Sequence, residues 1–273
     1  MSRLMLGLLV GLTSTPDECL AKVSTLGFPT CQVAVSNRAL LTKDVAVSLR
    51  QLADQLGIEI TTIFTHCRPN QIWNFVDGPT TIGLVPPETR REGVERLQRG
   101  ADFAAWAGVT NLATHVGFLP ENPGDPQNPG IIAALQEVAE HCRRLDRYFC
   151  FETGQETPIT LLRTIQDVGT ENLGINLDPA NLLMYGKANP VDALDVFGRY
   201  VRSVHAKDGE YPTNGRELGL EKPLGEGRVN FPILIPRLKA LGYTGPLTIE
   251  REVSGPLQLE GIEKARRALE PLL

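Results

Sequence analysis

The stretch "RYFCFETGQE", Arg147–Glu156, decides the fold, because an apolar run ends there in a carboxylate. Tyr148–Phe151 have the composition of a buried strand, and Glu152 follows where the chain should turn. A carboxylate next to an apolar strand costs free energy to desolvate unless something binds it. The stretch therefore predicts a strand whose carboxyl end carries a functional side chain.

Strands of this kind recur along the chain. Short apolar runs alternate with longer helical patterns, from a strand at residues 4–11 to a helix at residues 257–273. Helices between successive strands imply parallel strands with right-handed crossovers. We count eight strand and helix units, which is the number that closes a (β/α)8 TIM barrel. No linker divides the chain, so we expect a single α/β domain over residues 1–273.

Composition limits the function classes. The 273 residues are 42% hydrophobic and 22% charged with a net charge of −5, and no basic run favours nucleic acid. Five cysteines without a C-x-x-C motif predict reduced thiols in a cytoplasmic protein. The apolar start "MLGLLVGL" resembles a signal peptide, but it is short and only Arg3 flanks it, so we expect a buried strand. No run is long enough to span a membrane.

Four successive predicted strands end in a side chain that can bind a metal. They are Glu152 in "CFE", Asp178 in "NLD", His205 in "SVH" and Glu250 in "TIE". Because side chains alternate along a strand, the apolar residue before each should face the helices. The ligand and the residue two before it should face the barrel axis. The outward set is Phe151, Leu177, Val204 and Ile249, and the inward set is Cys150, Asn176, Ser203 and Thr248.

Three carboxylates this close would repel one another, and a divalent cation removes that repulsion. Oxygen-rich ligation with one imidazole suits Mn²⁺ best, with Mg²⁺, Co²⁺ or Zn²⁺ as alternatives. The histidines support such a site, since His66, His115 and His205 all lie at predicted strand ends. A single histidine is more often structural, as we expect for His141 in a helix, but three on one face of a barrel favour function.

The chain resembles the xylose isomerase-like barrels, in particular the sugar phosphate isomerase/epimerase family. The resemblance spans nearly the whole chain and is sharpest at "FETGQE", "NLDPAN", "VHAKDG", "LGEGRVNF" and "LTIERE". It implies a (β/α)8 barrel with one divalent metal bound by Glu152, Asp178, His205 and Glu250. In the ketose 3-epimerases of this superfamily the two glutamates also exchange protons with the substrate, which implies catalytic roles for Glu152 and Glu250.

The resemblance also implies substrate-binding residues. Arg228 in "GEGR" matches an arginine that holds substrate oxygens, although a surface ion pair is the plain alternative. Glu156 matches a substrate-contacting glutamate or is simply an acid in the first turn of a helix. Asn181 stands where the epimerases carry a substrate-contacting histidine, and asparagine cannot take a proton near neutral pH. We also expect His66 and His115 to contact substrate. Asp208 either orients a ligand or is a turn residue.

These observations predict a metal-dependent sugar or sugar phosphate isomerase or epimerase, working through an enediolate. The nearest alternative uses the same site as a lyase or dehydratase on an inosose or 3-keto-sugar, because the first proton abstraction is shared. A nuclease with several metals is disfavoured by only four histidines, and a non-catalytic sugar-binding barrel by the complete ligand set. The sequence leaves open the sugar, its phosphorylation and whether the chain forms a homo-oligomer.

Overall fold

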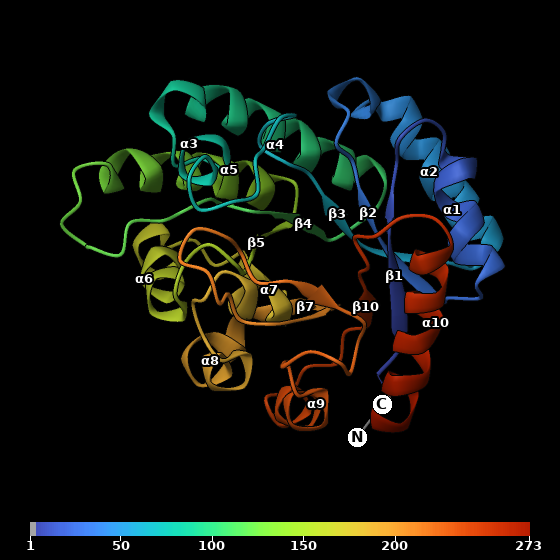
Figure 1. Ribbon diagram of the computed structural model, residues 1–273. Coiled ribbons are helices and arrows are strands. Elements are labelled where there is room, and N and C mark those ends of the chain that lie inside the picture. Colours follow the sequence, from blue (N-terminus) through green and yellow to red (C-terminus); the bar gives the residue numbers. More distant parts are fainter. Residues whose placement is uncertain (1–3) are drawn as a thin grey trace.

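The computed structural model describes residues 4–273, and it contains the predicted barrel. Eight parallel strands close on themselves in the order β1-β10-β7-β6-β5-β4-β3-β2, with the helices outside them (Figure 1). The (β/α)8 fold is therefore confirmed. The barrel strands are β1 (Leu6–Gly11), β2 (Thr30–Ala34), β3 (Glu59–Phe64), β4 (Asn111–Thr114), β5 (Tyr148–Glu152), β6 (Leu173–Leu177), β7 (Val201–Ala206) and β10 (Leu247–Ile249).

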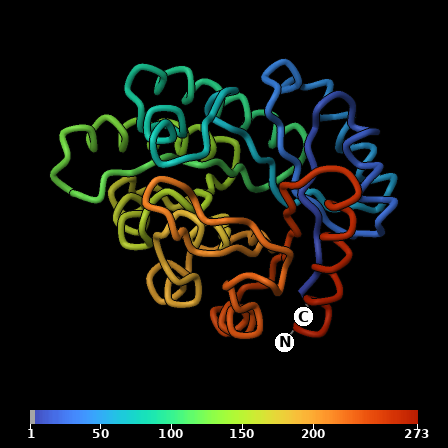
Figure 2. The backbone as a smooth tube through the Cα atoms, in the orientation of Figure 1, coloured from blue at the N-terminus to red at the C-terminus, as the bar shows by residue number. Residues whose placement is uncertain are grey.

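Threonine side chains cap the first turn of three outer helices. Thr15, Thr42 and Thr157 each accept a hydrogen bond from a backbone N–H in the first turn of the following helix. The path of the chain around the barrel can be followed in Figure 2. The helices are α1 (Pro16–Thr25), η1 (Arg38–Leu40), α2 (Lys43–Leu56), α3 (Gly78–Thr81), α4 (Pro87–Trp106), α5 (Asn128–Arg144), α6 (Pro158–Val168), α7 (Pro179–Met184), α8 (Pro190–Phe197), η2 (Gly198–Tyr200), α9 (Phe231–Ala240), α10 (Pro256–Leu269) and η3 (Glu270–Leu272).

The pleat of the strands separates an outer from an inner set of side chains. The predicted outward residues are almost fully buried in the large apolar core, and they are Phe151, Leu177, Val204 and Ile249. Cys150, one residue from Phe151, belongs instead to a small separate cluster with Phe64 and Ala113. The outer core thus holds the strands from behind, and the inner faces are free to carry polar side chains.

Two long connections lie at the carboxyl ends of the strands. One runs from β3 through α3 to α4, and the other contains a short antiparallel pair, β8 (Asp208–Gly209) and β9 (Glu221–Lys222). The first is held at its base where Gly83 crosses Val116. A Cβ atom on Gly83 would lie 2.0 Å from the Val116 carbonyl oxygen, and its φ is +76°. Only glycine permits that crossing.

Other features of the described chain agree with its composition. All five cysteines are free and buried. Within residues 4–273, no helix combines the length and apolar character needed to cross a bilayer. The apolar first stretch forms β1, as predicted, and it pairs with both β2 and β10.

Replacing Phe151 by alanine should destabilise the barrel, because the ring is fully buried behind β5 and packs edge to face on Phe149. We expect the free energy of unfolding to fall by about 3–5 kcal/mol. Ile159→Ala is the control, since Ile159 is 58% exposed on α6 and should change stability by less than about 0.5 kcal/mol. Denaturant unfolding measures both, and equal losses would contradict the assigned outer core.

Candidate metal centre

The four predicted ligands lie together at the carboxyl end of the barrel. Glu152 is the last residue of β5 and His205 lies in β7, whereas Asp178 and Glu250 directly follow β6 and β10. Each offers a ligand atom within 4.8 Å of the others. Asp178 also begins the short helix α7, where its Oδ1 accepts a hydrogen bond from the Asn181 N–H. That contact leaves Oδ2 to face the cluster.

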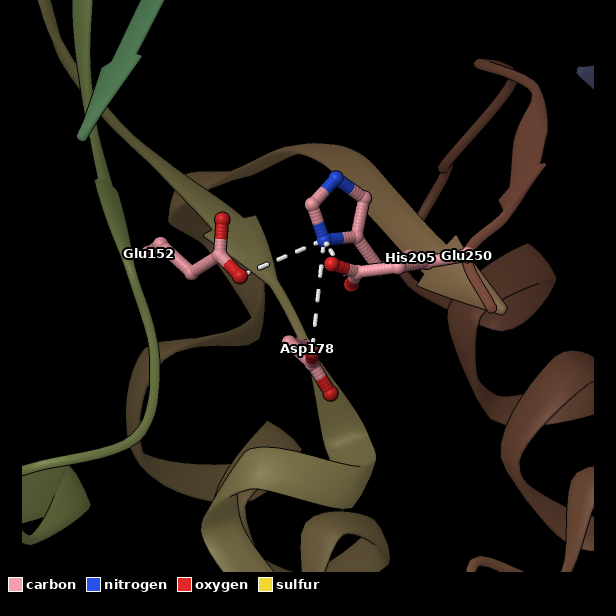
Figure 3. Close-up of side chains that lie close together, drawn as sticks. All are labelled: Glu152, Asp178, His205 and Glu250. Atoms are coloured by element: carbon pink, nitrogen blue, oxygen red, sulfur yellow. Dashed lines mark ion pairs between the residues drawn. The ribbon is translucent and has the colours of Figure 1, made fainter. Parts of the chain in front are cut away.

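His205 Nδ1 is the common point of the cluster (Figure 3). It lies 3.0 Å from Glu250 Oε2, 3.2 Å from Glu152 Oε1 and 4.0 Å from Asp178 Oδ2. On the other side of the ring, Nε2 lies 2.9 Å from Gln32 Oε1. Nε2 also lies 3.1 Å from Asn176 Nδ2, but that amide donates at a shorter distance, 2.8 Å, to Glu152 Oε2. Because the Gln32 carbonyl oxygen only accepts, the network favours a proton on Nε2 in the neutral ring, which leaves the Nδ1 lone pair for a metal.

Three of the buried side-chain atoms without a hydrogen-bond partner belong to the predicted ligands. His205 Nδ1, Asp178 Oδ2 and Glu250 Oε2 are all buried without a hydrogen bond. Buried polar atoms are normally paired, and a cation among these would satisfy all of them at once. Three carboxylate oxygens with one imidazole nitrogen suit a hard or borderline divalent ion. The residues present therefore fit the predicted metal.

The charges of the cluster depend on one another. Burial raises the pKa of Asp178 to about 8, although Lys207 opposes this. For Glu250, burial is outweighed by the charges of Lys207 and His205, which hold its pKa below the ordinary value. For His205, burial is outweighed by Glu152 and Glu250, which raise its pKa well above the ordinary value. In the metal-free cluster a proton on His205 thus partly replaces the cation.

A polar network inside the barrel holds two of the ligands. Asn176 donates a hydrogen bond to Glu152 Oε2 at 2.8 Å. The amide oxygen of Asn176 accepts from Gln32 at 3.2 Å and also from the Ser203 hydroxyl. β2 and β6 are not neighbours in the barrel, so the bond between Gln32 and Asn176 crosses its interior. Partners of this kind orient metal ligands and set their basicity.

Lys207 places a buried ammonium beside the carboxylates. Its Nζ lies 2.5 Å from Glu252 Oε1, 3.5 Å from Asp178 Oδ2 and 3.7 Å from Glu250 Oε2. The side chain is 1% exposed. Burial opposes its charge, but Glu250, Asp178 and Glu252 raise the pKa of Lys207 well above the ordinary value. The ammonium therefore stays charged and offsets part of the acidic cluster.

Asp208 has a different task from its neighbour Lys207. Its carboxylate accepts hydrogen bonds from the backbone N–H groups of four residues, which are Gly209, Gly225, Gly227 and Val229. These bonds support the interpretation of Asp208 as a turn residue rather than one that orients a metal ligand. The residue closes the base of the loop after β7 and touches no predicted ligand through these bonds.

A cavity of about 280 Å³ opens above the four ligands. Glu152, His205 and Glu250 line its floor. Its walls are largely apolar and aromatic and are formed by Leu9, Ala34, Phe64, Trp73, Met184, Tyr185 and Leu218. The volume is close to the lower limit for small-molecule sites, which suits a ligand of monosaccharide size.

Three of the five predicted substrate residues line this cavity: His66, His115 and Asn181. His115 Nε2 lies 3.6 Å from Glu152 Oε1. Burial lowers the pKa of His66 to about 4 and also lowers that of His115, so both rings are neutral near pH 7. Asn181 donates to Glu152 Oε1 at 3.4 Å and accepts from Lys207 at 3.3 Å, so it joins these two side chains.

The other two predicted substrate residues lie elsewhere. Glu156 is buried, neither carboxylate oxygen has a partner, and burial raises its pKa to about 8. Arg228 is exposed and lines a separate hollow with Asn230 and Phe231 at the start of α9. The structure does not bring Arg228 into the cavity above the four ligands. Contacts of Glu156 and Arg228 with substrate remain predictions.

Two contributors were missed by sequence reasoning. Gln32 lies in "TCQVAV", where a fully buried amide in an apolar strand is a usable signal of an internal partner. Trp73 comes from the long connection after β3, and its ring lies 4.7 Å from that of His115. No periodicity marks a loop residue in this way, so Trp73 required the folded chain.

The chain is thus a closed parallel barrel whose strand ends bring together three carboxylates and one histidine that could hold a metal. The chain belongs to the xylose isomerase-like TIM barrel family, whose profile matches residues 20–272. A crystal structure of a xylose isomerase domain protein from Planctomyces limnophilus is 34% identical. That comparison covers 99% of this chain and 96% of that one, with a TM-score of 0.91.

More distant similarities agree with the family. An uncharacterized protein of Methanocaldococcus jannaschii is 35% identical over 97 residues, so the match spans 35% of this chain and 31% of that protein. A D-tagatose 3-epimerase-like protein shares the fold at 21% identity, with 98% and 97% of the chains covered and a TM-score of 0.74. A Mycobacterium smegmatis barrel in complex with magnesium shares it at 21% identity, with 95% and 90% covered and a TM-score of 0.71.

Binding of Mn²⁺ should weaken as the pH falls. A divalent ion must displace the proton that Glu152 and Glu250 hold on His205, and it also requires ionised Asp178, whose pKa is about 8. Metal binding should therefore release protons, and the affinity should rise from about pH 6 to about pH 8. Calorimetric titrations in buffers of different ionisation enthalpy measure both effects. An affinity independent of pH would contradict the assigned ligand atoms.

Gln32→Leu should weaken Mn²⁺ binding without unfolding the chain. The change removes the acceptor that keeps the proton of His205 on Nε2, and we expect roughly a 10- to 100-fold loss of affinity. Gln98→Leu on the outer surface is the control, because Gln98 contacts Glu137 and no ligand. If the Gln32 variant and the unchanged protein bind Mn²⁺ with equal affinity, Gln32 has no role in the metal centre.

Proposed function

We propose that this chain is a divalent-metal-dependent isomerase or epimerase of a small sugar, with Glu152, Asp178, His205 and Glu250 as its metal ligands. The observation that carries the proposal is the pairing of an acidic, buried ligand set with an overlying cavity that Glu152 and Glu250 both line. Mn²⁺ is the expected ion, and Mg²⁺, Co²⁺ and Zn²⁺ also suit these ligands. The magnesium complex of the Mycobacterium relative supports a hard cation.

In the proposed reaction, Glu152 and Glu250 exchange protons with the substrate. Their oxygens lie on strands three positions apart around the barrel and both approach His205 Nδ1. One carboxylate takes the proton from the carbon beside the carbonyl, and the C–H electron pair forms the double bond of an enediolate. The other glutamate, protonated beforehand from solvent, returns its proton to the opposite face, and the proton taken by the first glutamate passes to solvent. A bound divalent ion would supply electrostatic stabilisation of the negative charge on the substrate oxygens.

The remaining site residues bind rather than transfer protons. Asn181 has an amide donor and acceptor, so it can hydrogen-bond a hydroxyl group but cannot titrate. The neutral rings of His66 and His115 can likewise donate to or accept from hydroxyl groups. Trp73 and Tyr185 offer flat apolar faces to the C–H surface of a sugar. We also propose that Glu156 and Arg228 assist binding, as their sequence context suggests.

The charge of the cavity favours an uncharged sugar over a sugar phosphate. Its charged floor and rim consist of Glu152, Glu250, Glu252 and His205, and the rest of its lining is largely apolar. A phosphate brought against these carboxylates would meet like charge, which disfavours binding. A lyase or dehydratase acting on an inosose or 3-keto-sugar is the alternative, because it begins with the same proton abstraction.

Solvent deuterium tests the shared proton step. Metal-loaded protein is incubated in D₂O with D-fructose, an inosose and a 3-keto-glucoside, and deuterium beside the carbonyl is measured by NMR. We expect metal-dependent exchange in the true substrate, and Glu250→Gln should slow it roughly a hundredfold or more. Glu95→Gln, on the exposed face of α4, should leave the rate unchanged.

The products then separate the alternatives. Interconverted ketoses support the isomerase or epimerase, whereas water loss with enone absorbance supports the lyase. Turnover without solvent deuterium, in which the hydrogen lost from C2 is recovered at C1, would indicate a hydride shift instead of proton exchange. Exchange that persists in Glu250→Gln would remove this carboxylate from the chemistry.

A further inference from the structure

The Lys207 ammonium occupies a position that resembles a cation site. Four oxygen atoms from four residues surround its Nζ at 2.5 to 3.7 Å, and they belong to Asp178, Asn181, Glu250 and Glu252. Three are carboxylate oxygens and one is an amide oxygen, which are ligands that hard divalent ions prefer. In this protein the position is filled by the chain itself.

Two of these oxygens also belong to the proposed metal centre. Asp178 Oδ2 and Glu250 Oε2 face both His205 Nδ1 and Lys207 Nζ. Carboxylates placed between two cations are the arrangement of two-metal sites, in which the ions lie about 3.5–4 Å apart. Glu252 and Asn181 would complete the second position, since both contact Lys207 Nζ and Glu252 is not a member of the four-residue ligand cluster.

Both positions depend on one segment of the chain. His205 lies in β7 and Lys207 directly follows the strand, and both side chains contact Asp178 Oδ2 and Glu250 Oε2. Charge agrees with this division. Glu152, Asp178, Glu250 and Glu252 carry four negative charges, and one divalent ion together with the ammonium leaves a single net negative charge. A second divalent ion beside the ammonium would meet strong repulsion.

We propose that Lys207 takes the place of a second cation and thereby keeps the metal centre mononuclear. The inference rests on the proposed metal site and goes beyond it, because it assigns the number of ions to one side chain. Lys207 is a positioning residue in this role, since it acts on the carboxylates and does not line the substrate cavity.

Counting the bound ions tests the proposal directly. Unchanged protein, Lys207→Ser and Lys207→Met are equilibrated with excess Mn²⁺ by dialysis, and manganese per chain is measured by mass spectrometry. Electron paramagnetic resonance then distinguishes an isolated Mn²⁺, with resolved hyperfine lines, from a coupled pair. Serine empties the position and removes its charge, whereas methionine removes the charge but keeps the space filled.

We expect about one ion per chain in the unchanged protein and about two, magnetically coupled, in Lys207→Ser. Lys207→Met should keep about one. Adding Glu252→Gln to Lys207→Ser should return the count to about one, because Glu252 is the carboxylate that belongs to the second position alone. Lys222→Ser is the matched control, because Lys222 pairs with Glu210 at 3.3 Å and with none of the proposed ligands. This variant should still bind about one ion per chain.

Other outcomes overturn the proposal. A single uncoupled ion in folded Lys207→Ser, or two ions in the unchanged protein, would show that Lys207 does not set the number of ions. Circular dichroism checks folding, and if Lys207→Ser does not fold, the unchanged protein and Lys207→Met still decide, because a pair in either contradicts the inference. If the unchanged protein binds no ion, the proposed metal-dependent function fails together with the role of Lys207. If it binds ions but their number does not depend on Lys207, only the role of Lys207 fails.

Discussion

Repulsion among buried carboxylates is the constraint on which this molecule depends. Glu152, Asp178 and Glu250 approach one another at the end of a closed barrel, where burial removes the water that would otherwise screen them. Such an arrangement persists only if the strands cannot separate and if positive charge is supplied. The apolar layer behind the strands meets the first requirement. His205 and Lys207 supply positive charge for the second requirement, and the proposed divalent ion would add to it.

Much of the fold followed from the sequence because strands of a barrel have a strict period. Alternation around Phe151 and Leu177 identified the outer face, and the same alternation placed Glu152 and His205 on the inner one. The carboxyl ends of parallel strands meet at one rim, so ligands far apart in the chain could be grouped. Proximity at the rim was therefore predictable from local patterns alone.

Features that depend on loops or on contacts across the barrel were not predictable in this way. Trp73 reaches the cavity from the long connection after β3, and that connection also contains the close approach of Gly83 to Val116, a contact between two loops. Arg228 follows a strand end in sequence, but the loop after β7 carries it to a different hollow. Lys207 was visible two residues after His205, yet its four oxygen neighbours come from two other segments, after β6 and after β10, and required the tertiary structure.

The bonds of Asp208 also bear on how this barrel can change over time. Its carboxylate accepts hydrogen bonds from the backbone of Gly225, Gly227 and Val229 at the base of the loop after β7, and residues 211–218 of that loop take no part in these bonds. A change of length within residues 211–218 would leave these bonds, and with them the strand that carries His205, in place. Leu218 from this part lines the cavity. A change in this loop would therefore alter the wall of the cavity without displacing the four clustered side chains below it.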